Sequence, residues 1–357
     1  MTLRDNVSGE EFGFRARVIV NASGPWTDLT NTELGSPTHV MGGTKGSHIV
    51  LDHPELYDAT GGRELFFEHS DGRIVLIYPL KGRVLVGTTD LEHDMADPIE
   101  CTEAEVDYFF TLVRHVFPEI AVTREQIVYR FAGVRPLPGH GDLAPGFVSR
   151  DYRIETAPLA GAGVDEDAPT VLSLVGGKWT TFRASAENLA DHVLAVLRAP
   201  RRTSTKGLAI GGGTDYPKTP RRRLAWIAAR AGGGVARERV AELLDRYGTR
   251  AEEVLAAISA DSTDAPLVGA PEYSTAEIAP LARTSGVVPL DDLLRRRPGV
   301  AFTGGATAEA VRAVAEAAAD ALGWDAARVE DEIERGRAEV NRAVPRDVAA
   351  VGERQSA

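Results

Sequence analysis

Hydrophobic and polar positions along the chain follow two different periods, and the change falls near residue 200. Before it, β-branched and aromatic runs alternate with glycine-containing turns, which predicts strands. The clearest runs cover residues 14–20, 42–51, 64–68, 73–79, 83–90, 126–131 and 171–175. Asp71-Gly72 and Lys81-Gly82 separate neighbouring runs, and such pairs favour tight hairpins. The pattern therefore predicts a mainly antiparallel sheet.

One helix interrupts these strands, and a second follows them. Thr102 and Glu105 have the spacing of a capping box, and an apolar stripe follows at Val106, Phe109, Phe110, Val113 and Val116. The second helical pattern runs from about Thr181 to Leu197, directly after the strand at 171–175.

Beyond residue 200 the apolar spacing of three and four residues predicts helices only. They are expected at 224–231, 235–247, 250–258, 275–282, 289–296, 307–322 and 326–344, with capping pairs at Thr249/Glu252 and Ser274/Glu277. Residues 198–223 are basic and rich in Gly, Pro and Thr, which is typical of a linker. We therefore divide the chain into an oxidoreductase-like part at 1–200, a linker at 201–223 and a helical domain at 224–357.

Composition narrows the class of protein. A formal charge of −12 over 357 residues argues against a nucleic-acid binder, and a single cysteine, Cys101, excludes a disulfide framework and a cysteine-built metal site. No apolar run is long enough to span a membrane, and from the acidic, polar residues 1–14 we expect no signal peptide. We expect a cytoplasmic protein. The basic linker leaves peripheral contact with the inner face of the cell membrane open, beside the alternative that it is solvated.

Two strand ends carry small residues that permit close backbone approach to a ligand. The run at 14–20 ends in Asn21-Ala22-Ser23-Gly24-Pro25. The run at 171–175 ends in Gly176-Gly177-Lys178 and opens the helix at 181–197. Free N–H groups at a helix start, with the helix dipole behind them, favour a negative atom. The alternative is a simple strand-to-helix turn.

Three cations follow strand signals, and one histidine stands at a strand start. Arg135, Arg150 and Lys178 could be surface charges, but together with the two glycine-rich ends they indicate a pocket for a phosphorylated substrate. His48 follows Lys45-Gly46-Ser47, and its role is either packing or proton acceptance. The histidines show no metal-ligand spacing, and no G-x-S-x-G elbow occurs. We expect no bound metal.

Six blocks that occur in order carry a resemblance to a known family. They are Asn21–Trp26, Lys45–His48, Val86–Asp90, Gly133–Leu137, Ser149–Tyr152 and Gly176–Arg183. The series resembles the FAD-dependent glycerol-3-phosphate dehydrogenase family. The helical tail, with Leu290–Arg297 and Leu322-Gly323-Trp324, is similar to the C-terminal cap domain of that family.

The resemblance implies oxidation of sn-glycerol 3-phosphate to dihydroxyacetone phosphate, with FAD as hydride acceptor and a membrane quinone as the next electron acceptor. It implies that Arg135 and Lys178 hold the phosphate and line the reacting centre, that Arg150 assists, and that His48 lies near the substrate hydroxyl. The FAD contacts it implies are Ala22, Ser23, Gly24, Gly177, Lys178, Trp179 and Thr180. It leaves monomer and homodimer open.

The sequence departs from the family at its beginning. The family starts with a βαβ unit whose G-x-G-x-x-G holds the FAD pyrophosphate, and no G-x-G-x-x-G occurs here. We expect an α/β fold with an incomplete FAD-binding layer, an antiparallel substrate-binding sheet and a helical C-terminal domain. We expect the chain alone to bind FAD weakly or not at all. An oxygen-using glycerophosphate oxidase and a non-catalytic remnant or interaction module are the alternative functions.

Overall fold

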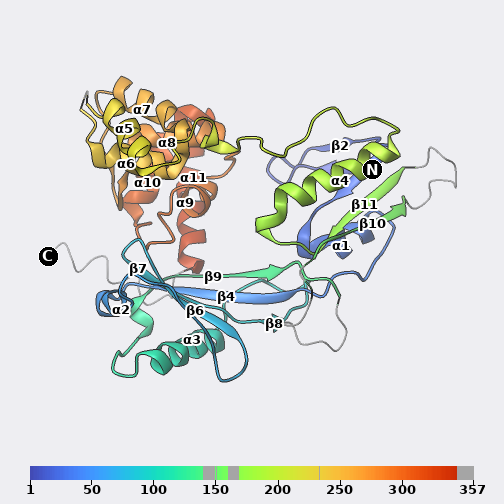
Figure 1. Ribbon diagram of the computed structural model, residues 1–357, viewed down its shortest axis with the longest axis horizontal. Coiled ribbons are helices and arrows are strands. Elements are labelled where there is room, and N and C mark those ends of the chain that lie inside the picture. The colour runs from blue at the N-terminus through green and yellow to red at the C-terminus, as the bar shows by residue number, and fades with distance from the viewer. Residues whose placement is uncertain (140–148, 150, 160–168, 233, 344–357) are drawn as a thin grey trace.

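The computed structural model describes residues 1–139, 149, 151–159, 169–232 and 234–343. Within these residues the chain forms a six-stranded sheet, a three-stranded sheet and a group of helices (Figure 1). This mixed α/β architecture confirms the predicted fold class.

The six-stranded sheet is antiparallel throughout. Its strands are β4 (Thr44–Leu51), β5 (Leu65–Glu68), β6 (Ile74–Leu80), β7 (Arg83–Gly87), β8 (Leu91–Glu92) and β9 (Ile127–Arg135). The order is β5-β6-β7-β4-β8, and β9 also pairs with β4. Gly72 at the β5–β6 turn, and Lys81 with Gly82 at the β6–β7 turn, have positive φ. The two predicted hairpins are therefore confirmed.

The helix α3 (Glu103–Val116) covers one face of this sheet, with α2 (Pro54–Ala59) beside it. The predicted capping box is present: Glu105 N–H donates to Thr102 Oγ1 at 3.3 Å, and Thr102 N–H donates to the Glu105 carboxylate at 2.9 Å. Phe109 is fully buried against the sheet side chains Ile49, Ile77 and Val86. Full burial of a side chain of this size contributes about 1.5–3 kcal/mol.

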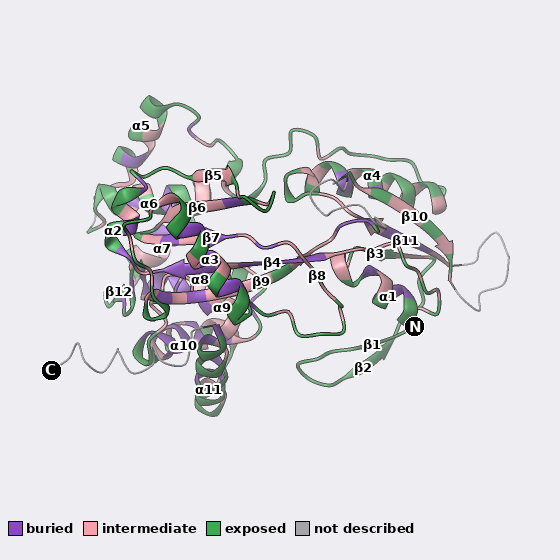
Figure 2. Cartoon of the chain, turned by 90° about the horizontal axis from the view of Figure 1, so that it is seen from below, coloured by how far each residue is buried: buried purple, intermediate pink, exposed green. Residues whose placement is uncertain are grey.

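The opposite face of the sheet packs on the helical part. Its helices are α5 (Pro220–Arg230), α6 (Arg237–Tyr247), α7 (Ala251–Ala260), α8 (Thr275–Thr284), α9 (Leu290–Arg296), α10 (Ala308–Leu322) and α11 (Ala326–Ala343). Val50 of β4 and Tyr129 of β9 belong to the same buried cluster as Leu290 and Leu293 of α9. Val311 and Val314 of α10 belong to this cluster too, and Figure 2 shows buried residues along α10.

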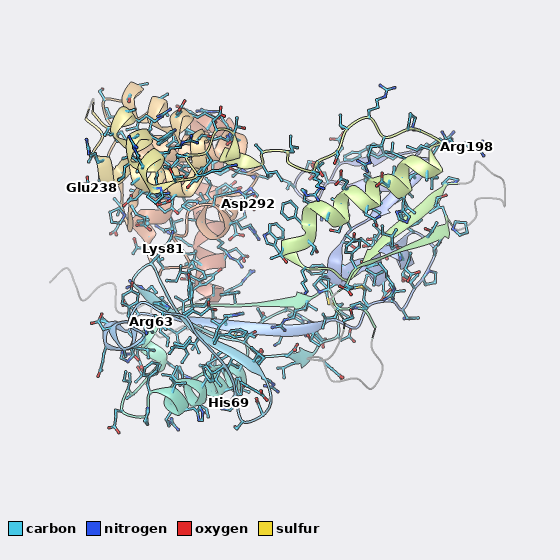
Figure 3. The ribbon with its side chains drawn as sticks, in the orientation of Figure 1. Arg63, His69, Lys81, Arg198, Glu238 and Asp292 are labelled. Carbon is cyan, nitrogen blue, oxygen red and sulfur yellow. The ribbon has the colours of Figure 1, made fainter. Side chains whose placement is uncertain are left out.

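The expectation of helices alone beyond the linker is wrong at one point. Strands β12 (Pro266–Leu267) and β13 (Ala270–Ser274) form a short hairpin between α7 and α8. Lys81, labelled in Figure 3, lies in the β6–β7 turn. Its ammonium is 5.5 Å from the ring centroid of Tyr273 in β13. The hairpin therefore takes part in the contact between the sheet and the helices.

The three-stranded sheet has the order β10-β11-β3. Its strands are β3 (Val18–Asn21), β10 (Arg153–Pro158) and β11 (Thr170–Val175). β10 pairs antiparallel with β11, whereas β11 pairs parallel with β3. Because parallel strands end at the same edge, the exits of β3 and β11 lie together. β3 leads through η1 (Gly24–Trp26) to α1 (Thr27–Glu33), and β11 leads through η4 (Trp179–Thr181) to α4 (Phe182–Val196).

An exposed N-terminal hairpin precedes β3. It consists of β1 (Thr2–Arg4) and β2 (Glu11–Gly13), and every residue in the two strands is exposed (Figure 2). At the other end of this part, the segment after α4 runs through η5 (Gly211–Gly213) to α5. Thr249 donates a hydrogen bond to the Gly212 carbonyl at 3.0 Å, which attaches this connection to the helical part.

Candidate functional site

Arg135 stands at the end of β9, where its guanidinium is held by the segment that follows β7. Nη1 lies 3.0 Å from the Asp90 carboxylate, and Nη2 donates to the Thr88 hydroxyl at 2.9 Å and the Thr89 carbonyl at 3.1 Å. The side chain of Arg135 is 25% exposed. A fixed guanidinium of this kind suits a phosphate or carboxylate ligand.

The backbone of β4 leaves the space that this guanidinium fills. Gly46 lies in the middle of the strand, and a Cβ added there would lie 2.4 Å from Nη2 of Arg135. The register of β4 on β9 places Thr44 opposite Arg135 and Gly46 opposite Gly133. The absence of a side chain at position 46 thus permits Arg135 to lie flat over β4.

His48 lies on the same face of β4 as Gly46, because side chains alternate along a strand. Its ring stacks on Phe131 of β9, with centroids 4.9 Å apart and planes 6° from parallel. Burial, and secondarily the charge of Arg135, lower the pKa of His48 to about 4. Its Nδ1 is buried and has no hydrogen-bond partner among the described residues. His48 is therefore a neutral imidazole that can accept a proton.

The ends of β3, β9 and β11 meet beside Arg135. Gly43 approaches the Arg135 carbonyl so closely that an added Cβ would lie 2.8 Å from it, and Gly24 lies against Pro136. At the exit of β11, a Cβ on Gly176 would lie 3.1 Å from Pro138. The two predicted glycine-rich strand ends are therefore brought together at the end of β9.

The predicted contacts of Lys178 and Arg150 stay predictions. Lys178 follows Gly177, is exposed and forms the extended residue before η4, with φ −125° and ψ 150°. It is two residues from Gly176, which follows β11 and lies against Pro138, just beyond the end of β9. Arg150 lies outside the described residues.

The hydroxyl of Ser23 is engaged in hydrogen bonds within the protein. Its hydroxyl donates to Asn21 at 2.7 Å and lies 2.9 Å from the hydroxyl of Thr30. Asn21 in turn donates to Asn31, which donates to Ser173 of β11 at 3.1 Å. This buried amide and hydroxyl network ties β3, α1 and β11 together, so Ala22–Gly24 offers backbone rather than the Ser23 hydroxyl.

Trp179 and Thr180, the other predicted FAD contacts, are exposed at the start of η4. Trp179 is 85% exposed and stacks on Phe182, with ring centroids 5.5 Å apart. Gly177 has a φ of +106°, a conformation that side-chain-bearing residues rarely adopt. This turn therefore exposes backbone and an aromatic surface, and the FAD contacts of its residues stay predictions.

The main omission from the sequence interpretation was Asp90. It holds both Arg135 and the Thr44 hydroxyl, and it follows the Thr88-Thr89 pair at the end of β7. The available signal was the polar run Thr88-Thr89-Asp90 immediately after a buried strand. The partner in β9 lies 45 residues further along the chain, beyond what local pattern reveals.

A cavity of about 450 Å³ lies at these strand ends, and its lining includes Pro25, Asp28, Met41, Gly42, Gly43 and Gly139. Asp28 accepts the N–H groups of Val40 and Met41, which fixes one wall. Among the described residues, no group of His, Cys, Asp and Glu side chains could hold a metal ion. None of the described helices has the length and apolar character required to cross a bilayer.

Comparison of the sequence with known proteins shows the family to which the chain belongs. Residues 2–192 match the model of the FAD dependent oxidoreductase family, and residues 203–329 match the model of the C-terminal domain of alpha-glycerophosphate oxidase. A glycerol-3-phosphate dehydrogenase of Synechocystis is 28% identical over 359 residues, covering 93% of this chain and 60% of the relative. Glycerol-3-phosphate dehydrogenase 2 of Mycobacterium tuberculosis is 29% identical and covers 98% of this chain and 58% of the relative.

Two further matches are a second curated relative and a solved structure. D-erythritol 1-phosphate dehydrogenase of Brucella abortus is 36% identical over 188 residues, covering 52% of this chain and 35% of the relative. The solved structure of the Bacillus halodurans glycerol-3-phosphate dehydrogenase, complexed with FAD, superposes with a TM-score of 0.76 at 24% identity. It covers 96% of this chain and 66% of that chain. The chain thus spans 60% or less of the length of these curated relatives.

Proposed function

Because the chain belongs to the family of FAD-dependent oxidoreductases that includes the glycerol-3-phosphate dehydrogenases, we propose that it oxidises sn-glycerol 3-phosphate to dihydroxyacetone phosphate and passes the electrons to a quinone. The observation that carries the proposal is the guanidinium of Arg135, fixed on the same face of β4 as the neutral ring of His48. One group suits the phosphate and the other suits the hydroxyl that is oxidised.

The edge where β3 and β11 end fits a flavin. In parallel sheets, ligands bind outside the carboxyl ends of the strands, and Gly24, Gly176 and Gly177 have positive φ at this edge. The N-terminus of α4, a helix of 15 residues, lies just beyond. We assign the FAD contacts to Ala22–Gly24 and Gly177–Thr180, with a helix dipole that favours negative charge on the ring. FAD, when bound there, supplies the acceptor for the hydride.

Arg135 has the role of binding the substrate phosphate and orienting the carbon chain over β4. Arg135 pairs with Asp90, and Thr88 and Thr89 keep the guanidinium in place. Lys178 and Arg150 are proposed to add positive charge around the same phosphate. Fixing one end of a small polyol limits which hydroxyl can reach His48.

His48 has the role of taking the hydroxyl proton when the hydride leaves carbon 2. A pKa of about 4 keeps the ring neutral near pH 7, and Arg135 contributes to that low pKa. Binding of an anionic phosphate at Arg135 would offset this contribution and raise the pKa of His48. Substrate binding and the basicity of the proton acceptor are thus coupled through one arginine.

The alternative electron acceptor is oxygen, as in a glycerophosphate oxidase. The match of residues 203–329 to the C-terminal domain of alpha-glycerophosphate oxidase is the observation that favours it. The alternative substrate is a longer polyol phosphate, since one relative is named for D-erythritol 1-phosphate. All these substrates share a phosphate ester and a secondary hydroxyl, so they share the need for Arg135 and His48.

The test is to purify the chain, add FAD, and record the visible spectrum and the product. Flavin bands that shift on addition of the protein to FAD, followed by formation of dihydroxyacetone phosphate with a quinone-like dye in excess FAD, would support the proposal. Hydrogen peroxide formed without the dye would support the oxidase. A protein that is folded by circular dichroism but neither retains FAD nor turns over would support a non-catalytic interaction module.

We also propose a cytoplasmic protein that reaches its quinone through peripheral membrane contact. The segment at 201–223 carries seven basic residues: Arg201, Arg202, Lys206, Lys218, Arg221, Arg222 and Arg223. Arg201 pairs with Asp191 and Arg223 with Asp245, so part of this charge serves the fold. Cosedimentation with anionic but not zwitterionic vesicles, weakened in Arg221→Gln/Arg222→Gln, would support it. Equal sedimentation with the two kinds of vesicle would contradict it.

We also propose a homodimer as one possible assembly. Light scattering, which measures the mass of the particle in solution, distinguishes it from a monomer.

A further inference from the structure

A buried ion pair lies on the face of β4 opposite the candidate site. The ammonium of Lys45 lies 2.8 Å from Glu105 of α3, and the two side chains are only 7% and 3% exposed. Lys45 also donates to the Glu100 carbonyl at 2.6 Å. Buried ion pairs contribute little net stability compared with well-packed apolar side chains. A role in fixing geometry is therefore the better explanation for this pair.

The carboxylate of Glu105 collects hydrogen bonds from three further residues. Oε1 accepts the hydroxyls of Ser47 at 2.8 Å and Thr89 at 2.6 Å, and Oε2 accepts the N–H of Thr102 at 2.9 Å. Burial by itself raises the pKa of Glu105. The hydrogen bonds from these donors and from Lys45 outweigh burial and lower the pKa to about 2. Glu105 is thus a permanent anion with both oxygens occupied.

Thr89 connects this anion to Arg135. Its hydroxyl donates to Glu105 and accepts the N–H of Ser47 at 2.9 Å, while its carbonyl accepts Nη2 of Arg135 at 3.1 Å. The neighbouring residues Thr88 and Asp90 hold the rest of the guanidinium. The segment after β7 is therefore attached to α3 on one side of the sheet and to the guanidinium on the other.

We propose that Glu105 is a positioning residue, which fixes Thr89 and through it the place where Arg135 meets the substrate phosphate. The inference rests on the proposed function, and Glu105 itself does not touch substrate. Lys45 and Ser47 point to the α3 side of β4, while Gly46 and His48 point to the other side. Glu105 therefore acts through the sheet, on the geometry of the site rather than on its chemistry.

The first test compares Thr89→Val with Thr89→Ser. Valine keeps the shape but removes the hydroxyl that joins Glu105 to the segment, whereas serine keeps it. Two quantities are measured: the affinity for sn-glycerol 3-phosphate by calorimetry, and the pKa of His48 by NMR. We expect Thr89→Val to bind about tenfold more weakly, since a charged hydrogen-bond fork loses its alignment. We expect its His48 pKa to rise, because Arg135 moves. Thr89→Ser should match the wild type in both.

The second test is Glu105→Gln, with Glu103→Gln on the exposed side of the same helix as the matched control. Glu103 is 61% exposed, so its change should leave both readouts unaltered. Glu105→Gln should repeat the effects of Thr89→Val. If it does not fold, judged by circular dichroism, the threonine pair carries the test alone.

Two outcomes separate this inference from the proposed function. A folded Thr89→Val protein with wild-type substrate affinity and wild-type His48 pKa would overturn the positioning role. The other outcome is that the wild type does not bind sn-glycerol 3-phosphate, while the pKa of His48 still differs between the wild type and Thr89→Val. This outcome would support the positioning role and overturn the proposed substrate.

Discussion

The guanidinium of Arg135 occupies the space that a side chain on Gly46 would need. An added Cβ would lie 2.4 Å from Nη2 and 2.6 Å from Nη1. A carbon and a nitrogen atom that are not bonded to each other do not approach so closely. Either the guanidinium of Arg135 or the strand at position 46 therefore has to move. The guanidinium is the end of a flexible side chain and can move at small cost, whereas the strand is paired on both sides by β7 and β9.

Gly46→Ala is therefore expected to fold and to displace Arg135. The affinity for sn-glycerol 3-phosphate, measured by calorimetry, should fall about tenfold or more, since the fork loses its contacts to Thr88 and Asp90. The matched control is Gly133→Ala in β9, directly opposite Gly46, where an added Cβ meets nothing within 4 Å. Wild-type affinity in Gly46→Ala would show that phosphate binds elsewhere.

The pKa of His48 predicts how stability depends on pH. The folded pKa is about 4 and the unfolded value is 6.5, so the unfolded state binds more protons between these values. The contribution of the neutral ring to the free energy of unfolding is fully present above pH 6.5 and is lost as the pH falls through 4. The total loss is about 3 kcal/mol. Denaturant unfolding at several pH values measures it.

His48→Gln should lack this loss, because no imidazole remains to be protonated in the unfolded state. His192→Gln is the control, since His192 is exposed on α4. It should follow the wild-type curve. If the free energy of unfolding changes by the same amount between pH 7 and pH 4.5 in the wild type and in His48→Gln, the assignment of a buried neutral histidine is contradicted.

Substrate binding is expected to raise the pKa of His48. A phosphate at Arg135 offsets the charge that helps to hold the pKa at about 4. NMR titration of the ring with saturating sn-glycerol 3-phosphate, and with glycerol as the uncharged control, measures the change. An unchanged pKa with the phosphate ester bound would place the phosphate away from Arg135.

The helical part has its own buried charge, at Glu277 of α8. This side chain is fully buried and accepts hydrogen bonds from Arg239, Arg246 and Tyr247. Glu277→Ala leaves two arginines without their buried partner, and should lower the free energy of unfolding by about 3–5 kcal/mol. Glu253→Ala, at a side chain 57% exposed, is the control and should change it by less than about 1 kcal/mol. Equal effects in denaturant unfolding would contradict this.

Local pattern predicted the elements of the fold but not their long-range pairing. The capping box of α3 and the two hairpin turns depend on residues close in sequence, and all three are confirmed. The parallel pairing of β3 with β11 joins residues 18–21 to residues 170–173, and no local signal specifies such a register. The short strands β12 and β13 were missed, because they are too brief to show a period of two.

The candidate site was predicted as a set of residue types rather than as a geometry. Arg135 and His48 were identified from their places at strand ends, and the structure puts them on one face. Glu105 was read only as a cap, since its ion pair with Lys45 spans 60 residues. The convergence of Lys178 with Arg135 stays a prediction. The FAD contact of Ser23 also stays a prediction, and its hydroxyl donates to Asn21 in the buried network.

The central claim is that this chain oxidises a polyol phosphate held by Arg135. Its most direct test is the anaerobic addition of sn-glycerol 3-phosphate to the FAD-supplemented protein, with the visible flavin absorption recorded over time. We predict bleaching in the wild type, at least tenfold slower bleaching in Arg135→Ala at the same substrate concentration, and none with glycerol. A wild-type protein that retains FAD but keeps its full flavin absorption in saturating sn-glycerol 3-phosphate would contradict the claim.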